Sequence, residues 1–223
     1  MSNMMDIGFV GLLVGVLGTG LGGFIVLLIG KPSDKFISFV LSFSAGIMIT
    51  IVTFDLLPEA FKISGVFVSV IGLVFGGLLA IWAEKIMHVK GQCNSKNKSQ
   101  CRKIGWLIGL GVALHNFPEG LAIGSGFSVG ESFGLSIAMV IAIHNIPEGV
   151  SIAAPLKYGG MTGLRALFYT ALVGVPLGVG AFIGAYLGNV SDVLISLCLG
   201  FAAGTMLVIT CEDILPNSKN INS

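Results

Sequence analysis

The sequence carries little charge, and this excludes a soluble globular domain. Only 10% of its 223 residues are charged and 54% are hydrophobic, whereas soluble domains carry about 25% charged residues. The mean hydropathy is +0.96. Because so little polar surface could face water, the chain is predicted to be a multi-pass protein of the cell membrane, with the lipid bilayer as its surroundings. The net charge of +1 gives no reason to expect a nucleic-acid partner.

Two further features are scarce. The N-terminus, "MSNMMDIGFV", has no basic segment ahead of its apolar run, so a cleaved signal peptide is not expected. The four cysteines form no CxxC pair, and nothing in their spacing suggests a disulfide framework. The first apolar run is therefore interpreted as a membrane helix.

Apolar runs long enough to cross a bilayer, which takes about 20 residues in a helix, fill most of the chain. Helices are expected because lipid leaves each backbone amide to be satisfied within its own segment, unless strands close into a barrel. The predicted fold class is an all-α polytopic membrane protein, with residues 1–223 forming a single transmembrane domain. Seven transmembrane helices are predicted, at residues 7–30, 36–57, 64–87, 104–125, 133–155, 162–187 and 190–215.

The distribution of Lys and Arg predicts the orientation of these helices. If the N-terminus lies outside, only Lys62 of the twelve Lys and Arg residues falls outside with it. This is a strong positive-inside asymmetry. The polar segment 88–103 is then a cytoplasmic loop. Its His88, Cys93 and Cys101 have the spacing of no closed zinc site, so a flexible basic linker is the preferred interpretation.

A repeated segment indicates internal symmetry. "AGIMITIVTFDLLP" (residues 45–58) matches "AGTMLVITCEDILP" (residues 203–216) without gaps, 158 residues apart. The first copy lies in a helix predicted to run outward, and the second in a helix predicted to run inward. Related segments of opposite direction form an inverted-topology repeat, which in transporters places a substrate site near the middle of the membrane.

A six-residue motif occurs twice in the predicted fourth and fifth helices, as HNFPEG from residue 115 and HNIPEG from residue 144. In each copy the histidine and the glutamate are four residues apart, so they share one helix face and can address one ion. The prolines, Pro118 and Pro147, each leave a backbone carbonyl without its helical donor. The predicted metal ligands are His115, Asn116, Glu119, His144, Asn145 and Glu148.

The alternative interpretation, hydrogen-bonded packing, would suit a single intramembrane histidine or asparagine. It fits two acidic copies poorly, because a carboxylate at the bilayer centre costs at least a few kcal/mol unless it is compensated. Two ionised glutamates would balance one dication. Imidazole with carboxylate suits Zn²⁺, and also Fe²⁺, Mn²⁺ or Cd²⁺, whereas Mg²⁺ and Ca²⁺ prefer oxygen ligands. The metal is expected as a transported substrate, and no prosthetic group is expected.

The two HNxPEG motifs, with "FDLLPEA" and "EDILP" in support, resemble the signatures of the Zrt/Irt-like protein (ZIP) family of divalent-metal transporters, especially its bacterial GufA/ZupT-like branch. The resemblance covers nearly the whole chain. It implies a mid-membrane site at the six predicted ligands and metal uptake, most of all of zinc, into the cytoplasm. It also implies that the helix bundle carrying the site moves to alternate access.

The sequence departs from the family pattern in two places. The family commonly has a Glu-Pro pair in its sixth helix, where this chain has Val175 before Pro176. One principal metal, or a second one bound more weakly, is therefore expected. The family usually has eight helices, and seven are predicted here. A truncated sequence and a neighbouring subunit, as in a homodimer, are both open explanations of that difference.

Four acidic residues near predicted helix ends are candidates for a metal pathway, since carboxylates at both mouths would raise the local cation concentration. Three of them lie inside the repeat, which favours a functional role over that of solvated interface residues. For Glu59 the two interpretations are evenly matched. The four candidates are Asp55, Glu59, Glu212 and Asp213.

Two other functions remain as alternatives to transport. An intramembrane zinc hydrolase would need an open coordination position and a general base, but no HExxH motif occurs, and no serine or cysteine is paired with either HNxPEG motif. The chain is therefore predicted not to be an enzyme. A metal sensor that binds without transporting is the other alternative.

Overall fold

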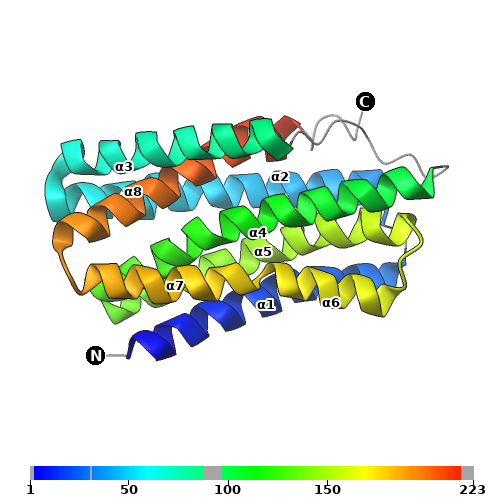
Figure 1. Cartoon of the computed structure of the whole chain (residues 1–223), viewed down its shortest axis with the longest axis horizontal. Coiled ribbons are helices and arrows are strands. Elements are labelled where there is room, and N and C mark those ends of the chain that lie inside the picture. The colour runs from blue at the N-terminus through cyan, green and yellow to red at the C-terminus, as the bar shows by residue number, and fades with distance from the viewer. Residues whose placement is uncertain (1–2, 31, 88–96, 217–223) are drawn as a thin grey trace.

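The computed structural model describes residues 3–30, 32–87 and 97–216, which fold almost entirely into helices, with no strand among them (Figure 1). This confirms the all-α prediction. The helices are α1 (Met4–Ile29), α2 (Asp34–Ile51), α3 (Leu57–Met87), α4 (Lys98–Val129), α5 (Glu131–Tyr158), α6 (Gly163–Val173), α7 (Val175–Gly188) and α8 (Asp192–Ile209), with π-helical turns η1 (Val52–Leu56) and η2 (Thr210–Ile214).

Five apolar helical stretches in the described part of the chain are long enough to cross a membrane. One of them, Lys35–Ala83, contains the second predicted helix and most of the third. Its helical geometry is interrupted at Gly65 (φ 81°, ψ 167°), and Figure 1 shows α2 and α3 joined at the left end of the bundle. α4 is not among the five, because its HNFPE residues interrupt the apolar run. The polytopic class is confirmed, and the count of seven crossings stays a prediction.

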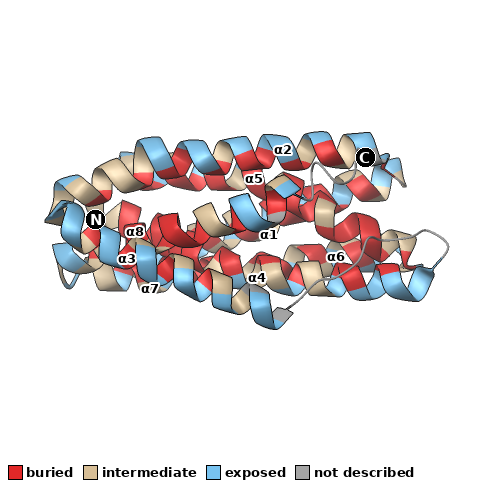
Figure 2. Ribbon diagram, turned by 90° about the horizontal axis from the view of Figure 1, so that it is seen from above, coloured by how far each residue is buried: buried red, intermediate tan, exposed pale blue. Residues whose placement is uncertain are grey.

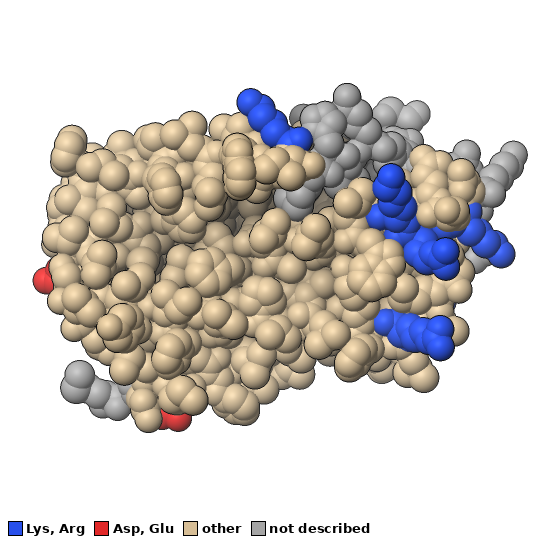
Figure 3. Space-filling view, in the orientation of Figure 1, with Lys and Arg blue, Asp and Glu red and all other residues tan. Residues whose placement is uncertain are grey.

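The outer faces of the bundle are apolar, as lipid surroundings require. Phe54 and Phe67 expose 77% and 79% of their surface. Figure 2 shows the buried residues gathered on the faces that the helices turn toward one another. In Figure 3 most of the visible Lys and Arg side chains lie toward the right-hand end, where α4 and α6 begin, and the visible Asp and Glu side chains lie at the left-hand end. On this face, positive charge is thus concentrated toward one end of an otherwise apolar bundle.

Two helices differ from the sequence prediction. The predicted sixth helix is broken at Gly174 into α6 and α7, because Pro176 has no N–H to continue the helical pattern. There the N–H of Leu177 donates to the carbonyl oxygen of Gly174 at 3.2 Å. α4 begins at Lys98, so residues 98–103 belong to this helix and not to the predicted loop. Asn97 caps that start, since its Oδ1 accepts from the N–H of Gln100 at 3.1 Å.

The repeat is visible as paired structure. Figure 1 shows α2 and α8 running in opposite directions, and each is followed by a π-helical turn, η1 and η2, at positions 158 residues apart. π-helical turns are rare and frequently lie at functional sites. Their recurrence at matching positions means that the two copies share backbone geometry as well as sequence.

Glycine contacts extend this relation to α1 and α7. A Cβ on Gly149 of α5 would overlap the carbonyl oxygen of Thr19 in α1, and a Cβ on Gly120 of α4 would overlap that of Leu177 in α7. Thr19 and Leu177 are also 158 residues apart. The HNxPEG glycines therefore hold α5 against α1 and α4 against α7 in equivalent ways. Close approach through small residues is the usual way for helices to pack in lipid.

Candidate metal site

The four ionisable residues of the HNxPEG motifs pair between helices. Nε2–H of His115, on α4, donates to Oε1 of Glu148, on α5, at 2.8 Å. Nε2–H of His144, on α5, donates to Oε1 of Glu119, on α4, at 2.9 Å. The sequence prediction placed each histidine with the glutamate of its own helix. The bonded pairs are crossed, so both helices contribute to each pair.

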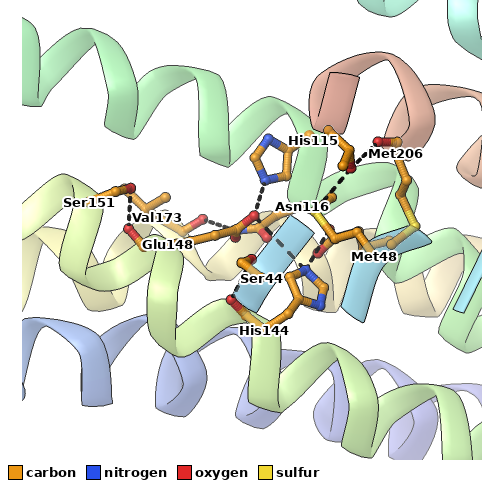
Figure 4. Close-up of polar contacts among 11 residues, drawn as sticks. Ser44, Met48, His115, Asn116, His144, Glu148, Ser151, Val173 and Met206 are labelled. Atoms are coloured by element: carbon orange, nitrogen blue, oxygen red, sulfur yellow. Dashed lines mark hydrogen bonds and ion pairs between the residues drawn. The ribbon is translucent and has the colours of Figure 1, made fainter. Parts of the chain in front are cut away.

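Glu148 lies between the two imidazoles. Its Oε1 is also 3.9 Å from Nε2 of His144, and Figure 4 shows the side chains of His115, His144 and Glu148 turned toward one another. Ligand atoms of His115, Glu119 and Glu148 all lie within 4.8 Å of one another. One imidazole and two carboxylates thus converge from two helices, while His144 joins the group through its bond to Glu119.

The site is shielded from solvent. Glu119 and His144 are 0% exposed, Glu148 is 2% and His115 is 9%. Several buried polar atoms here have no hydrogen-bond partner, among them Oε2 of both glutamates and Nδ1 of His144. Burying a polar atom without a partner is costly. Free carboxylate oxygens that face a buried histidine–glutamate cluster leave coordination capacity for a cation.

The two asparagines have different surroundings. Nδ2 of Asn116 donates to the carbonyl oxygen of Val173, at 2.9 Å, beside the break between α6 and α7. That interaction leaves Oδ1 of Asn116 without a partner. Neither amide atom of Asn145 has a partner, and its Cβ lies close to Gly18 of α1. Asn116 therefore stabilises the helix break, whereas the Asn145 amide remains available.

Residues of α2 and α8 close the site from one side, and sequence reasoning did not assign them a role there. Oγ of Ser44 donates to the carbonyl oxygen of His144 at 3.4 Å. Met48 and Met206 are almost completely buried, at 0% and 1% exposed, and Figure 4 shows both near the HNxPEG residues. Their matching places in the repeat were the available signal, but methionine at helical spacing usually indicates ordinary core packing.

Three of the four pathway candidates have described side chains, and none of the three belongs to this cluster. Asp55 is half-buried in η1. Glu59 forms an ion pair with Lys62, with 3.0 Å between Oε2 and Nζ. Glu212 is exposed in η2. The side chain of Asp213 falls outside the described part of the structure. Asp55 and Asp213 occupy the same position in the two π-helical turns.

The second half of the chain matches a protein-family model. Residues 87–222, more than half of the sequence, match the model described as ZIP Zinc transporter. This stretch contains both HNxPEG motifs, the α6–α7 break and the second copy of the repeat. The match agrees with the resemblance drawn from the motifs.

Three relatives carry the name "Zinc transporter ZupT". The protein from Escherichia fergusonii is 30% identical over 92% of this chain and 83% of its own length. The protein from Enterobacter sp. (strain 638) is 31% identical over 96% of this chain and 83% of its own, and the one from Salmonella heidelberg is 31% identical over 92% and 83%. The chain therefore belongs to the ZIP family of zinc transporters, in its ZupT-like branch, and is a transporter and not an enzyme.

Proposed function

We propose that this protein takes up Zn²⁺, or a similar divalent metal, into the cytoplasm through the site between α4 and α5. The observation that carries the proposal is the crossed pairing of two histidines with two glutamates inside the bundle. The relatives named as zinc transporters support zinc as the substrate. The site residues of the proposal are His115, Asn116, Glu119, His144, Asn145 and Glu148.

The chemistry of the pairs explains how a cation would be held. Each Nε2 that donates to a carboxylate is also the atom that a metal would bind once its proton has left. A dication can replace the shared proton, and metal binding at such ligands releases protons. Two carboxylates would neutralise the charge of the ion, so a zinc ion held by both would not leave a net charge in the bilayer.

Movement is needed for the metal to reach this site. His144 is completely buried, so the helices around it must separate from their neighbours during the cycle. We propose that α4 and α5, with α1 and α7 packed on them through glycines, move as one bundle against α2, α3 and α8. The bond from Ser44 to the carbonyl of His144, at 3.4 Å, would break in that movement.

We propose that the N-terminus lies outside and that the end where α4 and α6 begin is cytoplasmic. The excess of Lys and Arg at that end supports this orientation. Cys101 is disulfide-bonded, contrary to the sequence prediction, and disulfides are rare in the cytoplasm. Thiol labelling of Cys101 in intact cells treated with a reductant decides whether this end of the bundle is cytoplasmic or external. The proposed orientation predicts labelling by permeant maleimides alone.

The acidic residues at the π-helical turns would serve the pathway. Asp55 and Glu59 would attract cations at the outer mouth, and Glu212 and Asp213 would do so at the inner mouth. Glu212 is exposed, so it could contact hydrated ions. Asp55 is half-buried, so it could bind an ion on its way from the outer mouth to the central site.

Metal uptake by proteoliposomes tests the proposal. Replacing Glu119 and Glu148 together by Ala should abolish zinc uptake, because the cluster loses both charges that balance the ion. Glu131→Ala is the matched control, since Glu131 is an exposed acid at the start of α5. Undiminished uptake in the double variant would reject the proposal, as would zinc binding without any flux in the unaltered protein.

A further inference from the structure

We infer that the surface along the contact between α4 and α6, at the basic end of the bundle, binds the headgroup of an anionic phospholipid. Two arginines and two aromatic residues define this α4–α6 surface: Arg102 and Trp106 on α4, and Arg165 and Tyr169 on α6. The inference is independent of the proposed metal route.

The aromatic rings fix the arrangement of the two helices. The ring centroids of Trp106 and Tyr169 are 4.0 Å apart, with an interplanar angle of 57°, and the hydroxyl of Tyr169 donates to the carbonyl oxygen of Trp106 at 3.4 Å. α4 and α6 both begin at the right-hand end in Figure 1. The two helices therefore run in the same direction along this contact.

The arginines follow from helical spacing. Arg102 precedes Trp106 by four residues, and Arg165 precedes Tyr169 by four residues, so each arginine shares a helix face with its aromatic residue. Because the helices are parallel, both arginines lie about one turn, or about 5.4 Å, beyond the ring pair toward the end of the bundle. The α4–α6 surface thus carries two arginines at a similar level, about one helical turn beyond a pair of aromatic rings.

These positive charges are not neutralised within the described residues. Both arginines are exposed, and the salt bridges that the described residues form include neither of them. Arg102 packs beside Gly159, at the C-terminal end of α5, where a cation is favourable. Arg165 lies in the first turn of α6, where a cation is unfavourable. An external anion would compensate for that position.

The polarity of the α4–α6 surface changes along its length as that of a lipid does. Beyond the rings, away from the arginines, the same faces continue with Leu110 and Leu172, which are 51% and 48% exposed. Tryptophan and tyrosine prefer the interfacial layer of a membrane. Guanidinium groups would meet the phosphate, the rings the glycerol region, and the leucines the acyl chains. Basic sites between transmembrane helices bind anionic headgroups in this manner.

Fluorescence quenching by brominated lipids tests the inference in the full chain. The sequence has two tryptophans, so a Trp82→Phe background leaves Trp106 as the reporter. Brominated phosphatidylglycerol in phosphatidylcholine vesicles should associate with the α4–α6 surface about 25-fold more tightly than brominated phosphatidylcholine, at about fivefold for each arginine. In Arg102→Gln/Arg165→Gln the preference should fall below about twofold.

Two variants separate charge from folding. Arg102→Lys/Arg165→Lys keeps both charges and should keep most of the preference, whereas Lys62→Gln, at the other end of the bundle, should change nothing. Equal loss in the Lys and Gln double variants would overturn the inference, and so would an equal preference for both lipids in the parent protein. Displacement of the lipid by soluble glycerol phosphate would also overturn it, by showing a site for free phosphate.

Discussion

Glu148 is the residue on which the geometry of the metal site depends most. It bonds the imidazole of His115 at 2.8 Å and lies 3.9 Å from that of His144, whereas Glu119 bonds His144 alone. The two glutamates occupy equal places in their motifs, yet Glu148 is the more central residue of the cluster. The two copies of the motif are therefore not equivalent in the structure.

This difference predicts unequal effects of conservative substitutions. Glu148→Gln should weaken zinc binding about tenfold more than Glu119→Gln does, because Glu148 lies within 3.9 Å of both imidazoles, whereas Glu119 comes that close only to His144. Isothermal titration of zinc into the purified variants measures the ratio. Equal losses would mean that the two carboxylates bind the ion equivalently, against this account.

The candidate ligand residues could be selected from the sequence, and their role as ligands stays a prediction, but their pairing in the structure could not be foreseen. Helical periodicity fixes that His115 and Glu119 share a face. It does not fix how α4 is rotated about its axis, nor how far α4 is shifted along α5. The rotation and the shift together determine that His115 bonds Glu148. The partner of Asn116 was equally hidden, since the carbonyl of Val173 lies 57 residues further along the chain and is available only because the helix breaks there.

At the scale of helices, glycines set how closely the site-bearing elements approach one another. Gly149 lies so near α1 that any side chain would collide with the backbone of Thr19, while Gly46 on α2 has open space where its Cβ would be. The sequence contains 33 glycines, these two among them. It could not distinguish these two, because the distinction depends on which face meets a neighbour.

Alanine substitutions at the two positions should have opposite effects. Gly149→Ala should lower the free energy of unfolding by about 1–3 kcal/mol or more, since the added methyl group forces α5 away from α1. Gly46→Ala should be neutral or stabilising by up to about 1 kcal/mol, because alanine favours a helix over glycine. Thermal unfolding in detergent compares them, and equal melting temperatures would argue against the close α1–α5 contact.

At the scale of the whole molecule, an inverted pseudo-symmetry arranges the bundle around the metal site. The sequence revealed it in α2 and α8, where whole segments match. In α1 and α7 the contacts are equivalent, but residues such as Thr19 and Leu177 have no chemistry in common, so alignment alone could not find the relation. The symmetry fails at the α6–α7 break. Pro176 has no equivalent proline in α1, and the amide of Asn116 donates to the carbonyl oxygen of Val173, which the break leaves without a helical donor.

The central claim is that imidazole and carboxylate ligands from α4 and α5 bind the transported ion together. Zinc K-edge X-ray absorption of the zinc-loaded protein tests it most directly. The account predicts a shell of oxygen and imidazole nitrogen, whose imidazole contribution decreases in His115→Ala while Lys62→Ala leaves it unchanged. A shell without imidazole in the unaltered protein would contradict the account.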